Sequence, residues 1–408
     1  MHASLTRSTC SLKLLLVLSL LSVAASLSLP ALAGTQNPSS PSSIVDLKSR
    51  AESGDSMAQQ HLINFLSQAD TVAPGYDTAL AWARSAASRN DPGARFILGY
   101  LYEHGQGVAR DYAQAAQNYE AAALQGHAFA QNNLARLYSH GLGVPKDVTR
   151  AFGLFLTAAQ QGNRVAQWNL GHAYFEGDGT PRDYAQAARW FRVAAELGDP
   201  TAQHDLGVLY FKGQGVHVDY AEAAHWDGLS AQQGNPEAET DLGYFYGHGL
   251  GVPKDVTRAF RFFLAAAQQG NRIAQWNLGR AYYDGSGTPR DYAQAARWFR
   301  AAAELGDPFA QHDLGVLYFK GQGVPIDYAE AARWMRLAAL QGDPEADTDL
   351  GYFYETGKGV PLNYVEAYVW YSRASAAGDG LASRRRKSLS RLMTAKQLIE
   401  ASSFSAHE

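Results

Sequence analysis

Cysteine is nearly absent from this sequence, since Cys10 is the single cysteine among 408 residues. It lies in an N-terminal stretch that we expect to be removed, so the mature chain is predicted to contain none. This excludes disulfide bonds, thiolate metal sites and a cysteine nucleophile, and leaves packing to hold the fold together. A cationic excess is absent as well, because 35 Lys and Arg stand against 39 Asp and Glu, for a net charge of −4. Nucleic-acid binding depends on clustered cations, so we expect no nucleic-acid partner.

Long apolar runs are also missing, apart from one near the N-terminus. Residues 14–29 are largely apolar, but the run includes four serines and is shorter than the roughly 20 residues that cross a membrane. Arg7 and Lys13 precede it and Ala31-Leu32-Ala33 follows it, an arrangement typical of a secretory signal peptide over residues 1–33. An uncleaved membrane anchor is the alternative.

Removal of residues 1–33 takes away two basic and no acidic residues, leaving 33 basic and 39 acidic ones and a net charge of −6. We therefore predict an exported protein, periplasmic or secreted, that does not insert into the membrane after cleavage. Residues 34–52 begin with a segment rich in Pro and Ser and are predicted to form a polar linker.

Recognisable catalytic motifs are missing too. The sequence contains no G-x-S-x-G, S-x-x-K, H-E-x-x-H or paired C-x-x-C pattern, which excludes several serine-nucleophile and zinc-site layouts. His204 and His312 each precede an aspartate, but adjacent residues on a helix point about 100° apart. We therefore interpret these histidines as surface or groove residues, and expect no catalytic residues, no metal and no cofactor.

What the sequence does contain is a strict internal period. One alanine recurs every 36 residues, and around it run a leucine, a tyrosine, a G-x-G turn, an acidic cap and a second alanine-rich segment. Eight copies occupy residues 91–379, and a degenerate copy precedes them at residues 53–90. The recurring alanines are Ala94, Ala130, Ala166, Ala202, Ala238, Ala274, Ala310 and Ala346.

Residues 199–234 show how each copy is predicted to fold. Asp199 before a proline is an N-cap signal, and Ala202, Leu206 and Tyr210 fall on one stripe of a helix. Gly207 inside that helix is costly and indicates a close helix crossing, and the G-x-G at 213–215 ends the helix.

The second half of each copy is predicted to be another helix. Asp219 is its cap, and Glu222 three residues later predicts a capping box. Ala223, Trp226 and Ala231 are predicted to be buried. Each copy is thus helix, turn, helix, turn, and neighbouring copies must stack because one hairpin cannot bury its own apolar faces. Residues 380–408 are predicted to cap the end with one or two helices, whose apolar face is Leu381, Leu389, Leu392, Met393, Leu398 and Ile399.

The motifs A-Q-W-N-L-G, G-x-G-V-P-x-D-Y and A-x-x-W-x-x-x-A-A resemble the Sel1-like repeat, a relative of the tetratricopeptide repeat. The resemblance implies an all-α fold, a right-handed α/α superhelix (solenoid) of 36-residue helix-turn-helix repeats. It also implies a monomeric, non-enzymatic scaffold that binds a protein or peptide in its concave groove. One alternative is a secreted factor acting on a host or neighbouring cell. Another is a cell-wall or β-lactam hydrolase, because some cysteine-rich members are linked to penicillin binding or hydrolysis.

In tetratricopeptide-like solenoids the first helix of each pair lines the groove. There, Asn or Asp recurs at one position of seven copies, from Asn133 to Asp349. This ladder is interpreted either as inter-repeat hydrogen bonding or as a row of groups that clamps an extended peptide.

Neighbouring positions vary with a longer period of 108 residues, because residues 126–233 closely match residues 234–341. Exposed Trp, Tyr and Arg are typical interface anchors. The alternative is that Trp168 and Trp276 pack in the core. The predicted groove residues are Trp168, Asn169, His172, His204, Asp205, Tyr244, Trp276, Asn277, Arg280, His312, Asp313 and Tyr352.

Overall fold

The computed structural model describes residues 41–53, 55, 57, 58, 61, 62 and 76–404, and divides the chain into two compact units, Met1–Arg110 and Asp111–Glu408. The predicted signal peptide at residues 1–33 lies outside the described residues. Residues 41–52 form a helix rather than the linker predicted there, and they bury Leu47 and Ala51. Among the described residues, no helix is both long enough and apolar enough to span a membrane.

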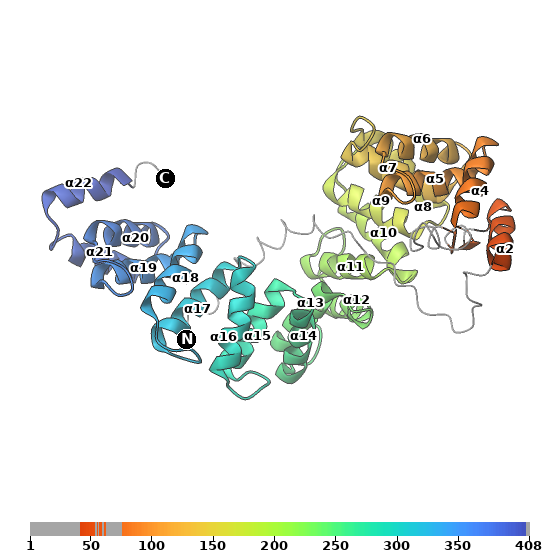
Figure 1. Ribbon diagram of the computed structural model, residues 1–408. Helices are drawn as coiled ribbons and strands as arrows, with labels where there is room; N and C mark the ends of the chain where they lie inside the picture. Colours follow the sequence, from red (N-terminus) through yellow and green to blue (C-terminus); the bar gives the residue numbers. More distant parts are fainter. Residues whose placement is uncertain (1–40, 54, 56, 59–60, 63–75, 405–408) are drawn as a thin grey trace. The chain divides into compact units, whose positions relative to one another are not determined.

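The described residues form helices and no strand (Figure 1). The first unit contains α2 (Pro41–Glu52), α4 (Tyr76–Ser88) and α5 (Pro92–His104). In the second unit, the first helices of successive repeats, called A helices, are α7 (Ala128–His140), α9 (Arg164–Glu176), α11 (Pro200–Lys212), α13 (Pro236–His248), α15 (Arg272–Asp284), α17 (Pro308–Lys320) and α19 (Pro344–Thr356).

The second helices, called B helices, alternate with the A helices along the chain. They are α6 (Tyr112–Ala123), α8 (Val148–Gln160), α10 (Tyr184–Glu196), α12 (Tyr220–Gln232), α14 (Val256–Gln268), α16 (Tyr292–Glu304), α18 (Tyr328–Leu340) and α20 (Tyr364–Ala376). Two shorter helices follow, α21 (Gly380–Leu389) and α22 (Ala395–Phe404). Within this unit each repeat helix packs on the next one along the chain (Figure 1). This is the all-α solenoid of 36-residue repeats that the sequence predicted.

The helix boundaries follow from the predicted caps. The Asp199 carboxylate accepts hydrogen bonds from the backbone N–H groups of Thr201 and Ala202, 3.1 and 3.0 Å away. Gly213 ends α11 with a left-handed φ of 67°, which glycine adopts without the strain that a Cβ would cause.

The predicted capping box is only half made. The Asp219 carboxylate caps α12 by accepting from the backbone N–H of Glu222, 3.0 Å away. The Asp219 N–H, however, donates to the carbonyl of Tyr210 at 3.0 Å. The Glu222 carboxylate instead accepts from the Trp226 indole N–H at 3.1 Å. The last turn of α11 thus supplies the backbone partner that a capping box would have supplied.

Two classes of glycine set the spacing of the helices. A Cβ on Gly207 in α11 would lie 3.0 Å from Oδ1 of Asp227 and 3.2 Å from the Ala223 carbonyl oxygen, both on α12, which confirms the predicted close crossing within a repeat. A Cβ on Gly215, the second glycine of its G-x-G turn, would lie 2.1 Å from the Tyr184 carbonyl oxygen at the start of α10. The second glycine therefore lets each turn approach the preceding repeat.

Neighbouring repeats share their cores. One cluster combines Phe191 and Ala195 from α10 with Leu206 and Leu209 from α11 and Trp226 from α12. This cluster contains residues from consecutive repeats. No single hairpin in it therefore forms a complete core by itself, as expected for a stacked solenoid.

The C-terminal helices differ in part from the predicted cap. Leu389 and Met393 are buried in a cluster with Ala382 and Ala401. Leu381, Leu392 and Ile399, predicted on the same face, are exposed. The chain breaks between α21 and α22, so the residues of the predicted face are divided between two helices and the turn that joins them.

Candidate functional site

The Asn and Asp ladder joins neighbouring A helices. The Trp168 indole N–H donates to the Asp205 carboxylate, with 2.7 Å between Nε1 and Oδ2. The Asn169 amide donates to the Asn132 side-chain oxygen at 2.9 Å. In each case the two residues are 37 positions apart. Inter-repeat hydrogen bonding, one of the two interpretations of the ladder, therefore accounts for these positions.

The same bond recurs one long period later. The Trp276 indole N–H donates to the Asp313 carboxylate, with 2.8 Å between Nε1 and Oδ2. The Asn277 amide behaves differently from Asn169, because it donates to the Ile273 carbonyl of its own helix at 2.9 Å.

The two tryptophans belong both to the core and to the surface. Trp168 and Trp276 are half-buried and pack against hydrophobic clusters of their own. Each has a basic partner one helical turn later. The His172 ring lies 5.6 Å from the Trp168 ring, and the Arg280 guanidinium lies 5.9 Å from the centre of the Trp276 ring. The side chain of Arg280 is 36% exposed and pairs with Asp284 at 3.3 Å. Each of the two matching 108-residue segments thus places a half-buried indole beside a nitrogen-containing side chain, an imidazole in the first and a guanidinium in the second.

Tyr244 and Tyr352 are held in aromatic clusters. The Tyr244 ring lies 6.2 Å from the Phe211 ring. The Tyr352 hydroxyl accepts a hydrogen bond from the Lys358 ammonium at 3.1 Å, and that ammonium lies 5.3 Å from the centre of the Phe319 ring. Tyr244 and Tyr352 therefore both lie beside a phenylalanine of the preceding A helix.

A cluster of titratable groups lies at the junction of α11, α12 and α13. The His204 Nδ1 lies 2.9 Å from Oδ1 of Asp227 and 4.0 Å from Oδ2 of Asp241. The sequence predicted His204 as a groove residue, but the shared repeat pattern did not indicate Asp227 or Asp241 as its partners. The signal for Asp227 was available, because this position is aromatic or Met in the other B helices of the repeats.

Burial and charge act strongly on this cluster. Burial raises the pKa of Asp227 to about 7, against the hydrogen bond and charge of His204. Burial alone would lower the pKa of His204, but its hydrogen bond to Asp227 and the charges of Asp227, Asp241 and Asp205 raise it to about 10. Burial also raises the pKa of Asp205 and Asp241.

The corresponding histidine one 108-residue period later, predicted to be a surface or groove residue, is buried. His312 is 5% exposed, because it packs between neighbouring A helices. Its Nε2 lies 3.2 Å from Oδ2 of Asp349 on α19. The position that corresponds to Asp227 is here Met335, which is buried.

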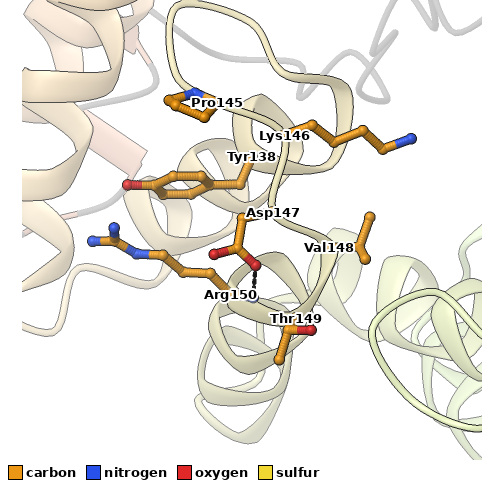
Figure 2. Close-up of a pocket in the computed structure, with 7 residues that line it drawn as sticks. All are labelled: Tyr138, Pro145, Lys146, Asp147, Val148, Thr149 and Arg150. Atoms are coloured by element: carbon orange, nitrogen blue, oxygen red, sulfur yellow. Dashed lines mark hydrogen bonds between the residues drawn. The ribbon is translucent and has the colours of Figure 1, made fainter.

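A shallow depression of about 480 Å³ lies at the turn between α7 and α8 (Figure 2). Its lining groups serve the fold. The Asp147 carboxylate caps α8 by accepting from the Arg150 N–H at 2.9 Å, and the Arg150 guanidinium lies 4.4 Å from the centre of the Tyr138 ring. The Lys146 side chain points away from Tyr138 (Figure 2). The depression therefore offers mainly groups already used in capping and stacking.

The comparisons with known proteins agree with this architecture. The sequence matches the Sel1 repeat over residues 67–91 and over eight consecutive segments from 92–127 to 344–379. A solved Sel1 repeat protein from Oxalobacter formigenes shares 30% identity with a TM-score of 0.60, over 80% of this chain and 94% of that one. No curated protein gives a significant match.

A second solved structure is a protective antigen of uropathogenic Escherichia coli strains that displays an SLR fold. It is 32% identical over 88% of this chain and 92% of that chain, with a TM-score of 0.49. With nine matched repeats and 30% identity to the Oxalobacter formigenes protein, the chain belongs to the Sel1 repeat family.

Proposed function

We propose that this protein is an exported, non-catalytic scaffold that binds a protein partner along the A helices of residues 164–356. The observation that carries the proposal is the duplicated pair formed by a half-buried tryptophan and a base, Trp168 with His172 and Trp276 with Arg280. Trp and Arg are enriched among the residues that dominate binding energies.

The geometry of these pairs favours binding over mere stacking of repeats. Each indole is fixed by its hydrogen bond to the next repeat, so a partner that packs on its edge would immobilise little additional side-chain freedom. Arg280 keeps part of its guanidinium accessible while its pair with Asp284 orients it. A guanidinium held in this way suits a carboxylate or a backbone carbonyl on the partner.

The test uses charge reversal at an accessible position, because replacing either tryptophan would also disturb the core. The purified chain would be used to capture partners from the native compartment, and each captured protein would then be measured by calorimetry. Arg280→Glu should raise the Kd by at least about 10-fold. Arg261→Glu makes the same charge change at an exposed residue of the B helix α14. It should leave the Kd within about 2-fold.

Equal binding by the two variants and the unaltered chain would refute the A-helix surface. Turnover of a β-lactam or a muropeptide by the purified chain would refute the non-catalytic part of the proposal.

Export is the other half of the proposal, and it is supported by the charged start, the apolar run and the small-residue site of residues 1–33. Cell fractionation should find the protein in the periplasm or the medium, with a mature chain that begins at Gly34. A variant lacking residues 1–33 should stay in the cytoplasm. Retention of both forms in the cytoplasm would contradict export, and recovery mainly in the medium would favour a secreted factor.

A further inference from the structure

Asp227 stands at a position of the repeat that is otherwise apolar or aromatic. It is fully buried, and its Oδ2 atom has no hydrogen-bond partner within the described part of the chain. Burying an unsatisfied carboxylate oxygen is costly. The residues at the corresponding position of the other repeats are Tyr119, Phe155, Phe191, Phe263, Phe299, Met335 and Tyr371.

A second polar substitution lies one turn away on the same helix. Ser230 replaces an alanine that the other repeats carry, and its hydroxyl donates to the Pro200 carbonyl at 2.6 Å. That bond gives the buried Ser230 hydroxyl a partner, so of these two substituted polar side chains only Asp227 has an unpartnered oxygen.

Three potential ligand atoms converge there from three consecutive helices. They are one ring nitrogen of His204 from α11, one carboxylate oxygen of Asp227 from α12 and one carboxylate oxygen of Asp241 from α13, all within 4.8 Å of one another. Ligand atoms of a tetrahedral zinc ion lie about 3.4 Å apart, given metal–ligand distances of about 2.1 Å. The observed distances from Nδ1, 2.9 Å to Asp227 and 4.0 Å to Asp241, bracket that value.

We propose that His204, Asp227 and Asp241 bind one divalent transition-metal ion of the zinc class. An imidazole nitrogen with two carboxylates suits Zn²⁺, Co²⁺ or Mn²⁺, whereas Mg²⁺ and Ca²⁺ prefer an all-oxygen set. The side chains of His204 and Asp241 are 17% and 30% exposed, so solvent reaches part of the site.

The alternative is a simple imidazole–carboxylate pair. Such a pair gives a partner to one oxygen of Asp227. It explains neither the unpartnered Oδ2 of Asp227 nor the presence of a second carboxylate, that of Asp241, near the same imidazole. The negatively charged neighbour Asp205 adds further charge, and Lys212 is the cation that acts on Asp241. A divalent cation balances this excess of carboxylates directly.

The duplicated block provides an internal comparison. His312 and Asp349 correspond to His204 and Asp241, 108 residues later, but Met335 stands in place of Asp227. Two ligands therefore remain there without the third, and we expect that junction not to bind the ion.

The experiment measures Zn²⁺ binding to the purified full chain by calorimetry, with Co²⁺ absorption as a probe of geometry. The unaltered chain should bind one ion, and Asp227→Met should weaken binding by at least about 100-fold. Met335 shows that the repeat accommodates methionine at this position, so the variant is expected to fold, as circular dichroism would verify. The reciprocal variant, Met335→Asp, should raise the stoichiometry to two.

His312→Gln is the matched control, because it changes a histidine of equivalent position outside the site and should leave Zn²⁺ affinity unchanged. If Asp227→Met fails to fold, His204→Gln serves as the second loss-of-site variant. Failure of the unaltered chain to bind Zn²⁺ or Co²⁺ would overturn the proposal, as would equal affinity in the Asp227→Met variant. Neither result depends on a protein partner, so this test and that of the scaffold function can fail independently.

Discussion

The indole of Trp168 and the carboxylate of Asp205 bridge two successive A helices, with 2.7 Å between Nε1 and Oδ2. Trp276 and Asp313 repeat the bridge at 2.8 Å. Because solenoid stability is a sum of repeat and interface terms, such a bond acts directly on the interface between neighbouring repeats. It also fixes the indole whose edge forms part of the proposed binding surface.

Replacing Trp168 by Phe should lower the free energy of unfolding by about 1–3 kcal/mol, because the half-buried Asp205 carboxylate loses its donor. Urea unfolding followed by circular dichroism measures the loss. Trp190→Phe is the control, since the Trp190 indole makes no hydrogen bond within the described residues. Similar losses in the two variants would show that ring volume, rather than the hydrogen bond, stabilises the interface.

The second glycine of the G-x-G turn should tolerate substitution far less than the glycine after the B helix. Gly215 and Gly234 both have positive φ, 72° and 81°, but only Gly215 faces the backbone of the preceding repeat. Gly234→Ala should cost about 1 kcal/mol of backbone strain. Gly215→Ala should cost about 2 kcal/mol more, because its Cβ meets the Tyr184 carbonyl. Equal changes in thermal midpoint would contradict the proposed role in repeat stacking.

The period of the sequence was sufficient to predict the fold. A period of 36 residues with caps, apolar stripes and glycine turns specifies two helices per repeat, and neighbours with unsatisfied apolar faces must stack. The prediction of a complete capping box was wrong, because the Asp219 N–H donates to the Tyr210 carbonyl instead of to the Glu222 side chain. That contact depends on turn geometry, which residue spacing does not encode.

The candidate site was predicted less well, for two physical reasons. Helical geometry places Trp168 at the boundary between core and groove, so residue type and spacing could not separate the two interpretations. Asp227 was not predicted because the site residues were chosen from positions whose residue type the repeats share. Asp227 differs from the residue type of the other repeats at its position. A buried aspartate in an otherwise aromatic column is visible in the sequence once the repeats are aligned.

The C-terminal cap offers a test of which leucines complete the core. Leu389 is fully buried, whereas Leu392 is 66% exposed. Leu389→Ala should lower the free energy of unfolding by about 2–4 kcal/mol through loss of packing. Leu392→Ala should change it by less than about 0.5 kcal/mol. A large loss for Leu392→Ala, measured by urea unfolding, would mean that a partner or a second copy covers the outer face of the cap.

His127 is the exception among the residues that cap the A helices. The other six A helices are capped by Asp or Asn, and here an imidazole Nδ1 accepts the Ala130 N–H at 3.2 Å. The cap requires a neutral ring, because a protonated Nδ1 cannot accept a hydrogen bond. Burial lowers the pKa of His127 from 6.5 to about 4.

The cap should therefore make the protein acid-sensitive. The pKa is lower in the folded state, so between about pH 6.5 and pH 4 the unfolded chain binds more protons, and the free energy of unfolding falls as the pH decreases. The loss is at most about 3 kcal/mol, at 1.36 kcal/mol per pKa unit. His127→Asn keeps a capping oxygen but removes the titration, so its stability relative to the unaltered chain should rise as the pH is lowered through this window. Urea unfolding at several pH values measures the difference, and since all other groups are common to both chains, parallel pH profiles would mean that His127 remains solvated in the folded protein.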